Sequence, residues 1–364
     1  MISSLMRILA IETSCDETAV ALLEINGALE KPDIKILGNS LLSQIQLHEK
    51  YGGVYPNLAK REHEKNLPIL LEQTLEEAGE DKESPNIDCI AVTAGPGLEP
   101  ALWVGITVAE TLGKKWNKPV IPVNHMAGHM FSVLYGTYEA LVMPALALLV
   151  SGGHTELVYV KDFGDYEIIG KTRDDAVGEA FDKTARMLGL PYPGGPQISR
   201  LAQLSRERKE EDEIKLPRPM IHSKDLDFSF SGLKTAVLYK IKSENRSDSD
   251  SEFKEDMARA FEDAAIEVLV EKTRRALEKL DNIKTLIVAG GVAANLHLSQ
   301  EIKKIVNEFP DISLRMPTKL LTTDNAIMIG IAAFIKIGIG SEILKNQIAI
   351  KARGNLSISP VQGL

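Results

Sequence analysis

Two stretches of the sequence decide the fold: residues 8–23, ILAIETSCDETAVALL, and residues 145–160, ALALLVSGGHTELVYV. In each stretch a short apolar run is followed by a polar turn and a second apolar run. This pattern is typical of two β-strands joined by a turn. The two stretches share few identical residues, but because the same pattern occurs twice in one chain we predict a duplicated fold.

Outside these stretches, short apolar runs alternate with longer helical patterns. Further strands are predicted over residues 90–93, 120–123 and 286–289, and helices over residues 66–78, 101–115, from 124 onward, 174–188, 253–280, 295–306 and 322–335. Strands that alternate with helices along the chain indicate an α/β protein. Residues 191–196, rich in Pro and Gly, and residues 243–252, rich in Ser and Asp, are predicted to be loops.

The composition narrows the class of protein. A chain of 364 residues suits two domains, and 44% hydrophobic with 26% charged residues is the balance of a globular protein rather than a disordered one. The net charge of −9 excludes an overall basic coat, and 5% aromatic residues argue against a wide stacking surface for single strands. Any contact with nucleic acid must therefore use a local patch or a partner protein.

The cysteine content and the apolar runs bear on the compartment. Cys15 and Cys89 are the two cysteines, which excludes a disulfide scaffold and fits a reducing environment. The longest apolar stretch, residues 326–335, is about half of a membrane span. The N-terminal residues lack the features of a signal or transit segment. We expect a cytoplasmic protein without a membrane anchor.

The stretch NHMAGH over residues 124–129 carries a possible metal site. His125 and His129 are four residues apart on a predicted helix, so they share one face and can bind one divalent metal ion. Histidines at a helix start also serve as packing or capping residues, so both interpretations stay open here. A zincin protease would need Glu after the first histidine, but Met126 is there.

A third ligand must come from another part of the chain. Asp324 is a candidate because it starts a predicted helix. The competing interpretation is that Asp324 caps that helix, which is the more common role of Asp at this position.

Glycine turns after predicted strands are candidate phosphate sites. Ser151-Gly152-Gly153 and Gly290-Gly291 each follow an apolar strand, and glycines let a backbone approach a phosphate closely. Neither turn matches the Walker A or Rossmann pattern, and paired glycines also occur for turn geometry alone. Asp182 is a further candidate, either as an acceptor for ligand hydroxyls or as a solvated helix residue.

Ten motifs occur in order over residues 7–340 and together resemble one family. They are IETSCDET (11–18), YGGV with REH (51–54, 61–63), GPGL (95–98), NHMAGH (124–129), VSGGHT (150–155), GEAFDK (178–183), PGGP (193–196), DFSFSGLK (227–234), AGGVAAN (289–295) and TDN (323–325). The family is the bacterial-type tRNA threonylcarbamoyladenosine transferases, formerly named glycoproteases or O-sialoglycoprotein endopeptidases.

The resemblance implies an α/β, two-lobed, actin-like and hexokinase-like ATPase fold, with duplicated subdomains around a nucleotide cleft. On this basis we expect a first lobe over residues 1–140, a second lobe over 141–320, a helix over 321–345 that carries Asp324 back to the first lobe, and a tail over 346–364. The implied reaction moves the threonylcarbamoyl group from threonylcarbamoyl-AMP to the N6 amine of adenosine 37 in tRNAs that read codons beginning with adenine.

The site residues of the family carry over position by position. The implied metal ligands are His125, His129 and Asp324, which would hold one divalent ion per subunit; Fe²⁺ is implied and Zn²⁺ also suits these ligands. The implied positions for the adenylate substrate are Leu149, Val150, Ser151, Gly152, Gly153, Asp182, Gly195 and Asn295. No general base is assigned. Glu12 and Asp16 are the nearest candidates, and a structural role in the turn is the alternative for both.

The resemblance also implies partner molecules, and departures from the family pattern bear on the contacts with them. Relatives act with tRNA, a paralogous dimerisation subunit (TsaB-like) and a small ATPase (TsaE-like). The sequence departs from the family pattern at Asn57, Lys60, Glu99 and Pro100, which leaves the metal and nucleotide positions intact but puts partner or tRNA contacts in doubt. The competing functions are a nucleotide-binding actin-like or chaperone-like protein, a sugar kinase and a protease; neither of the first two needs a two-histidine metal site.

Overall fold

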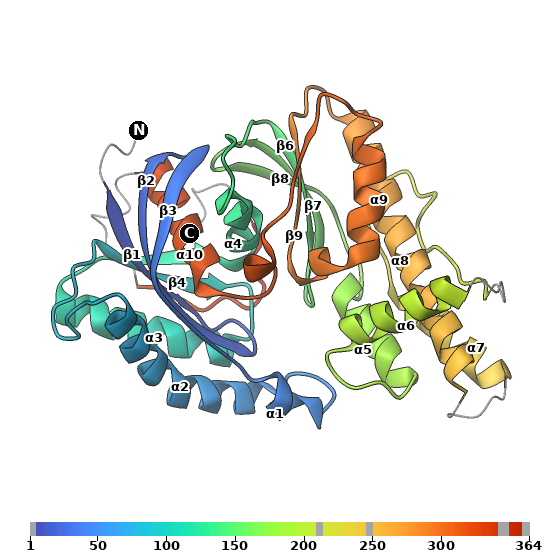
Figure 1. The fold of residues 1–364 in the computed structure, drawn as a ribbon, viewed down its shortest axis with the longest axis horizontal. Coiled ribbons are helices and arrows are strands. Elements are labelled where there is room, and N and C mark those ends of the chain that lie inside the picture. Colours follow the sequence, from blue (N-terminus) through green and yellow to red (C-terminus); the bar gives the residue numbers. More distant parts are fainter. Residues whose placement is uncertain (1–4, 209–213, 245–249, 341–348, 359–364) are drawn as a thin grey trace.

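The computed structural model describes residues 5–208, 214–244, 250–340 and 349–358. Figure 1 shows two lobes side by side, each built around one β-sheet. The first sheet has the strand order β3-β2-β1-β4-β5, and the second has the order β10-β9-β6-β7-β8. The strands of the first sheet are β1 (Met6–Glu12), β2 (Glu17–Ala28), β3 (Lys31–Ser43), β4 (Cys89–Gly95) and β5 (Val120–Asn124). Those of the second are β6 (Ala145–Val150), β7 (Thr155–Asp162), β8 (Asp165–Lys171), β9 (Thr285–Ala289) and β10 (Ser313–Arg315).

The two sheets have the same topology. In the first, β1 pairs antiparallel with β2, β2 antiparallel with β3, and β1 parallel with β4, which pairs parallel with β5. In the second, β6, β7, β8, β9 and β10 repeat these pairings in the same order. The duplicated α/β fold predicted from the two strand–turn–strand stretches is therefore confirmed.

The third strand of each unit was not predicted. β3 is an edge strand with the sequence KPDIKILGNSLLS, in which Pro32 and several polar residues break up the apolar run. β8 is the corresponding edge strand of the second sheet. Edge strands need to bury only part of their side chains, so the apolar signal on which the prediction relied is weak there.

Both sheets are buried on both faces, and their side chains alternate between two cores. In β1, Ile8 and Ala10 join a central core, while Leu9 and Ile11 join an outer one. In β6, residues 145, 147 and 149 face the same central core, and residues 146, 148 and 150 face the core of the second lobe. The central core is therefore shared by the two sheets.

Helices cover each of these faces. Residues of α2 (Pro56–Glu77) and α3 (Glu99–Trp116) form the outer core of the first lobe, and α4 (His125–Phe131) and α10 (Ala326–Ile339) enter the central core. The second lobe carries α5 (Val177–Met187), α6 (Gly194–Arg208), α7 (Ser231–Glu244), α8 (Ser251–Lys279) and α9 (Leu296–Val306). Short elements are α1 (Ile45–Glu49) and the 3₁₀ turns η1 (Ser132–Leu134), η2 (Gly291–Ala294) and η3 (Lys319–Leu321).

Several helix predictions need correction. The helix predicted from residue 66 begins at Pro56 and continues through Pro68. Pro56 is tolerated because it stands in the first turn of the helix, whereas Pro68 inside the helix obscured the helical pattern of the sequence. The loop predicted over 191–196 ends where α6 begins at Gly194. α7 was missed; the loop predicted over 243–252 overlaps α7 and α8, and residues 245–249 of it lie outside the described residues.

α10 belongs to the first lobe in space although it comes near the end of the chain. It packs on β1 and β2, and a Cβ atom at Gly330 would lie 2.4 Å from Leu23 Cδ1 and 3.4 Å from Ala10 Cβ. This close approach requires glycine. In the part of the chain that the structure describes, no helix combines the length and the apolar character needed to cross a bilayer.

Candidate metal centre and substrate cleft

The two histidines are placed by the junction of β5 and α4. Asn124 ends β5 and caps α4, since its side-chain oxygen accepts hydrogen bonds from the backbone N–H groups of Met126 (2.8 Å) and Ala127 (3.2 Å). The spacing of four residues then puts the rings of His125 and His129 on one face of the helix, with centroids 4.7 Å apart and planes at 84°. The predicted common face of the two histidines is confirmed.

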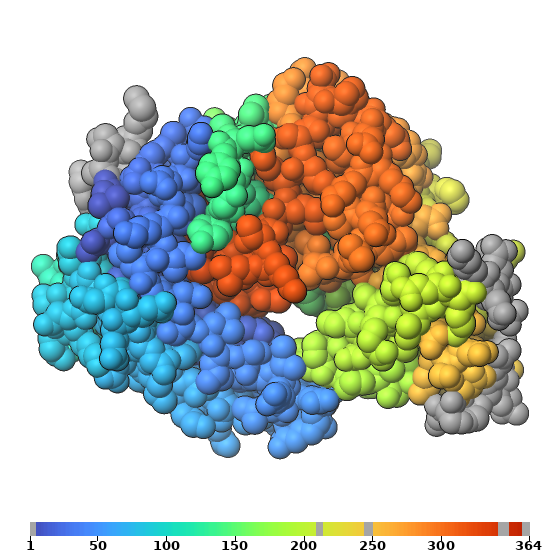
Figure 2. All heavy atoms as spheres, in the orientation of Figure 1, coloured from blue at the N-terminus to red at the C-terminus, as the bar shows by residue number. Residues whose placement is uncertain are grey.

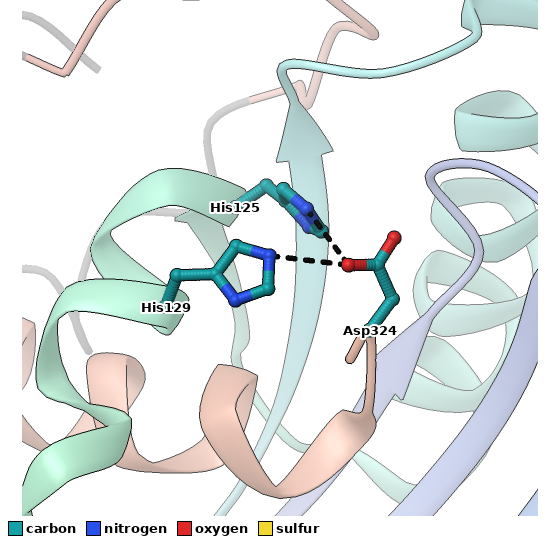
Figure 3. Close-up of side chains that lie close together, drawn as sticks. All are labelled: His125, His129 and Asp324. Atoms are coloured by element: carbon teal, nitrogen blue, oxygen red, sulfur yellow. Dashed lines mark hydrogen bonds and ion pairs between the residues drawn. The ribbon is translucent and has the colours of Figure 1, made fainter. Parts of the chain in front are cut away.

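Asp324 reaches this face from the segment before α10. Gly128 lets the two helices approach, because a Cβ there would lie 3.1 Å from side-chain atoms of both Met328 and Ile329. The cap of α10 is Asn325, whose side chain accepts a hydrogen bond from the backbone of Met328 at 2.9 Å. The alternative role of Asp324 as the helix cap is therefore wrong, and its carboxylate is directed at the histidines (Figure 3).

The geometry of these three side chains suits one metal ion. Asp324 Oδ1 lies 3.3 Å from His125 Nε2 and 3.1 Å from His129 Nε2. One candidate ligand atom from each of the three residues lies within 4.8 Å of the others. Ligands about 2.0–2.1 Å from a tetrahedral ion stand about 3.3 Å from one another, so the two separations between Asp324 and the histidines match those of ligands on a common ion. Two imidazoles and one carboxylate are also donors that divalent transition metals accept.

Glu12 supports this group from the end of β1. It is fully buried, and its Oε2 lies 3.0 Å from His125 Nδ1 and accepts a hydrogen bond from Thr93 Oγ1 at 2.7 Å. Its other oxygen accepts a hydrogen bond from the backbone N–H of Ser14. Glu12 thus holds the turn and orients the His125 ring so that Nε2 faces Asp324, as carboxylates beside metal-bound histidines do. Sequence reasoning placed Glu12 near the site but gave no sign of this contact.

The pKa values of the group reflect the carboxylates that surround the histidines. Burial lowers the pKa of His125, but the carboxylates of Asp324 and Glu12 overcome it and raise the pKa well above its usual value. Burial would raise the pKa of Asp324, and the two imidazoles instead hold it well below its usual range. Asp324 is therefore ionised at neutral pH and offers an anionic ligand atom.

A third histidine lies near the centre, which sequence reasoning missed. Burial, together with the nearby His125 and His129, lowers the pKa of His154 to about 4, so that His154 is neutral at physiological pH. It belongs to the turn after β6, where its carbonyl accepts a hydrogen bond from the backbone N–H of Ser151 at 2.8 Å. Because α4 also packs against β6 and β9, the predicted phosphate turn and the metal group are neighbours.

The glycine turns lie at one edge of the second sheet. β6 and β9 are parallel, with Leu149 opposite Ala289, so the turns that follow them are side by side. Gly290 has φ +95°, and a Cβ there would lie 2.4 Å from the carbonyl oxygen of Val150, so this glycine is required for packing. In contrast, a Cβ at any of four other glycines would meet no described atom within 4 Å. These are Gly152, Gly153, Gly195 and Gly291.

Two candidate substrate residues are already engaged by the protein. Asp182 Oδ1 accepts a hydrogen bond from the backbone N–H of Gly194 at 2.7 Å, and burial raises its pKa. Asn295 caps α9, and its amide nitrogen donates to Ser199 Oγ at 2.8 Å and to Glu262 Oε1 at 2.7 Å. Both side chains therefore fix the walls of the site. Buried Glu262 was missed, because an acidic residue inside a long helix carries no distinguishing signal.

An opening between the lobes lies beside the site. Figure 2 shows it between the blue segment that contains α1 and the yellow-green α5 and α6. A pocket of about 410 Å³ there is lined by both lobes. The lining residues are Glu49, Lys50, Tyr51 and Gly52 from the first lobe and Asp182, Arg186, Gly189, Leu190, Pro191 and Tyr192 from the second. The Arg186 guanidinium donates a hydrogen bond to the Gly52 carbonyl across this opening.

Comparison with solved structures supports the fold. HypF from T. kodakarensis superposes with a TM-score of 0.54 at 14% sequence identity, over 93% of this chain and 49% of that one. A full-length HypF in a phosphate- and nucleotide-bound form gives a TM-score of 0.55 at 13% identity, over 92% of this chain and 47% of that one. This chain spans about half the length of those proteins. At these identities the likeness concerns the fold alone, which here is a two-lobed α/β architecture with one five-stranded sheet in each lobe.

Sequence comparison gives the family. The sequence model of the TsaD family, described as tRNA N6-adenosine threonylcarbamoyltransferase, matches residues 35–331. The protein of that name from Thermosipho africanus is 47% identical over 339 residues, which cover 93% of this chain and 97% of that one. The protein of that name from Staphylococcus carnosus is 46% identical over 325 residues, 89% of each chain. This chain belongs to the tRNA N6-adenosine threonylcarbamoyltransferase family.

Proposed function

We propose that this chain transfers a threonylcarbamoyl group from threonylcarbamoyl-AMP to the N6 amine of adenosine 37 in tRNAs that read codons beginning with adenine. Its family membership supports an acyltransferase that acts on tRNA. The single structural observation behind the finer proposal is the group formed by His125, His129 and Asp324 next to the glycine turn at Ser151. Transfer from an activated carbamate with an adenylate leaving group needs both a Lewis acid that polarises the donor oxygens and a site that binds the phosphate of the adenylate.

His125, His129 and Asp324 would hold one divalent ion per subunit. The family resemblance favours Fe²⁺, and Zn²⁺ also suits two nitrogens and one carboxylate oxygen. When bound, such an ion supplies a Lewis acid that holds donor oxygens and spreads developing negative charge. Glu12 orients His125 for this task through its 3.0 Å contact.

The backbone at the glycine turns would receive the adenylate. Gly152, Gly153 and Gly291 leave open space where a side chain would stand, so the backbone N–H groups there can approach a phosphate. Leu149 and Val150, inside β6, and Asn295, which caps α9, keep the turns in register. Because the N6 amine of adenine is a weak nucleophile, holding it close to the carbamate would supply much of the rate.

The competing function is a nucleotide-binding protein of the actin or chaperone kind without group transfer. Such a protein needs the cleft but not a metal group of two histidines and one aspartate. The curated relatives that match the chain over about nine-tenths of its length carry a transferase name. The transferase is therefore the function that the site supports best.

Partners and location follow from this proposal. The net charge of −9 disfavours tight binding of tRNA by the whole surface, which is consistent with sharing tRNA with a paralogous dimerisation subunit and a small ATPase. A tRNA-modifying enzyme works where tRNA is found, so we propose the cytoplasm. For the lobes we propose the boundaries expected from the sequence, which are residues 1–140, 141–320, 321–345 and 346–364.

The test combines metal content with product formation. The wild-type chain, His125→Ala and, as a control, exposed His222→Ala are incubated with threonylcarbamoyl-AMP and a tRNA that reads codons beginning with adenine, with and without the companion subunits. We expect wild type and His222→Ala to hold about one metal ion per chain and to form the modified nucleoside, detected by mass spectrometry. His125→Ala should lose both. No product from wild type, while an enzyme known to be active works in the same mixture, would refute the proposal.

A further inference from the structure

Two tyrosines form an exposed pair between α1 and α2. Tyr51 is 53% exposed and Tyr55 is 52% exposed, and their rings stack with centroids 5.6 Å apart and planes at 27°. Lys50 Nζ lies 5.0 Å from the centre of the Tyr51 ring. We call Lys50, Tyr51 and Tyr55 the tyrosine platform. Such large rings normally bury their surface, so an exposed stacked pair beside a cation indicates a binding surface.

The tyrosine platform lies at the entrance to the cleft. Lys50 and Tyr51 line the pocket of about 410 Å³ between the lobes, and Asp182 and Tyr192 line its opposite wall. Asp16, in the turn next to the metal group, lies close enough to both of these wall residues to raise their pKa values, in addition to the effect of burial. The pocket thus connects the platform with the turn that adjoins the metal centre.

The backbone beneath the platform is fixed by buried hydrogen bonds. The N–H of Tyr55 donates to His48 Nδ1 at 3.3 Å, and His48 Nε2 donates to Gln44 Oε1 at 3.1 Å. Both His48 and Gln44 are fully buried. A platform held in place before binding loses little conformational entropy when a ligand stacks on it.

The charges around the pocket favour a base over a phosphate as the occupant. The lining holds two acids, Glu49 and Asp182, and two cations, Lys50 and Arg186, so it has no excess of positive charge to hold a phosphate. The platform itself offers a flat ring face with one cation, Lys50. Exposed aromatic rings with a nearby cation are the usual means of binding unpaired bases. A local contact of this kind is compatible with a chain of net charge −9.

We propose that the tyrosine platform stacks against an unpaired base of the tRNA loop that carries the acceptor adenosine. The proposal rests on the function proposed above. An adenine must leave its stack before its N6 amine can reach the metal group, and this unstacking costs free energy. A ring face at the cleft entrance offsets that cost by giving a base of the opened loop a new stacking partner.

The test measures RNA binding separately from group transfer. A fluorescently labelled anticodon stem-loop and a fully paired RNA of equal length are titrated with wild type and with the double variant Tyr51→Ala/Tyr55→Ala. We expect the double variant to bind the stem-loop roughly 10- to 100-fold more weakly, since one stacked base is worth about that factor. Binding of the paired RNA should not change, because its bases are not free to stack. Tyr51→Phe/Tyr55→Phe should restore stem-loop binding, and Tyr138→Ala, at a residue that is 92% exposed, should match wild type.

Kinetics distinguish a failure of this proposal from a failure of the proposed function. In the transfer reaction, the Ala double variant should raise KM for tRNA by a similar factor and leave kcat and the KM of the donor unchanged. Stem-loop binding by wild type without product formation would refute the transferase function and leave the platform standing. A wild-type chain that does not bind the stem-loop, or an Ala double variant that binds it equally well, overturns the platform.

Discussion

Glu12→Gln tests whether the metal group depends on a buried carboxylate. Three donors converge on Glu12: the backbone N–H of Ser14, Thr93 Oγ1 and His125 Nδ1. Thr93 and His125 both contact the Oε2 atom of Glu12, and Ser14 contacts the Oε1 atom. A carboxylate accepts all three hydrogen bonds, whereas a glutamine of the same shape has one oxygen and one NH₂ group.

Either orientation of the glutamine amide leaves a conflict. With the NH₂ group toward His125, Nδ1 becomes the acceptor and the proton moves to Nε2, the nitrogen that faces Asp324. With the NH₂ group toward Ser14, two N–H donors face each other in a buried site. The first case blocks the ligand nitrogen, and the second leaves a buried donor unsatisfied, which costs about 1–3 kcal/mol.

We therefore expect Glu12→Gln to weaken metal binding by about 10- to 100-fold, the usual effect of losing such an orienting partner. The affinity is measured by competition with a chelator of known strength, and the metal-free stability by urea denaturation. Glu156→Gln is the matched control, since Glu156 is also a buried carboxylate but lies in β7. Equal metal affinity of Glu12→Gln and wild type would refute this account of Glu12.

Two further predictions concern stability. Gly290→Ala should lower the free energy of unfolding by about 1–3 kcal/mol, because the new Cβ would lie 2.4 Å from the Val150 carbonyl oxygen at a positive φ. Gly291→Ala, where a Cβ meets open space, should change the free energy of unfolding by less than about 0.5 kcal/mol. Similar urea midpoints for the two variants would contradict this prediction. Burial lowers the pKa of Lys336 to about 8, although its Nζ donates to the Pro122 carbonyl at 2.7 Å. The unfolded chain therefore binds more protons between pH 8 and the usual lysine pKa, and stability from this group rises with pH across that window by about 2–3 kcal/mol. Lys336→Met should lose this rise. If urea denaturation gives the variant and wild type the same change in the free energy of unfolding between pH 7 and pH 9.5, the reasoning is wrong.

The sequence predicted the parts of the fold that follow from local periodicity. Central strands such as β1 and β6 are continuous apolar runs, because both faces of each sheet are buried, and their repeated pattern revealed the duplication. It missed β3 and β8, whose edge positions weaken the apolar signal, and α6, whose start at Gly194 resembles a loop. In the structure the backbone N–H of Gly194 donates a hydrogen bond to Asp182, a residue of another helix, and this contact cannot be read from the local sequence.

For the site, the sequence by itself determined the spacing of His125 and His129, because a separation of four residues fixes a common helix face wherever that helix lies. Only the tertiary structure decided that Asp324, 195 residues further along than His129, completes the group and that Asn325 takes the cap instead. It also decided the role of Glu12 and placed the tyrosine platform at the cleft entrance. The physical reason is that hydrogen-bond and helix geometry act over a few residues, whereas a metal group or a cleft forms where separately folded segments pack together.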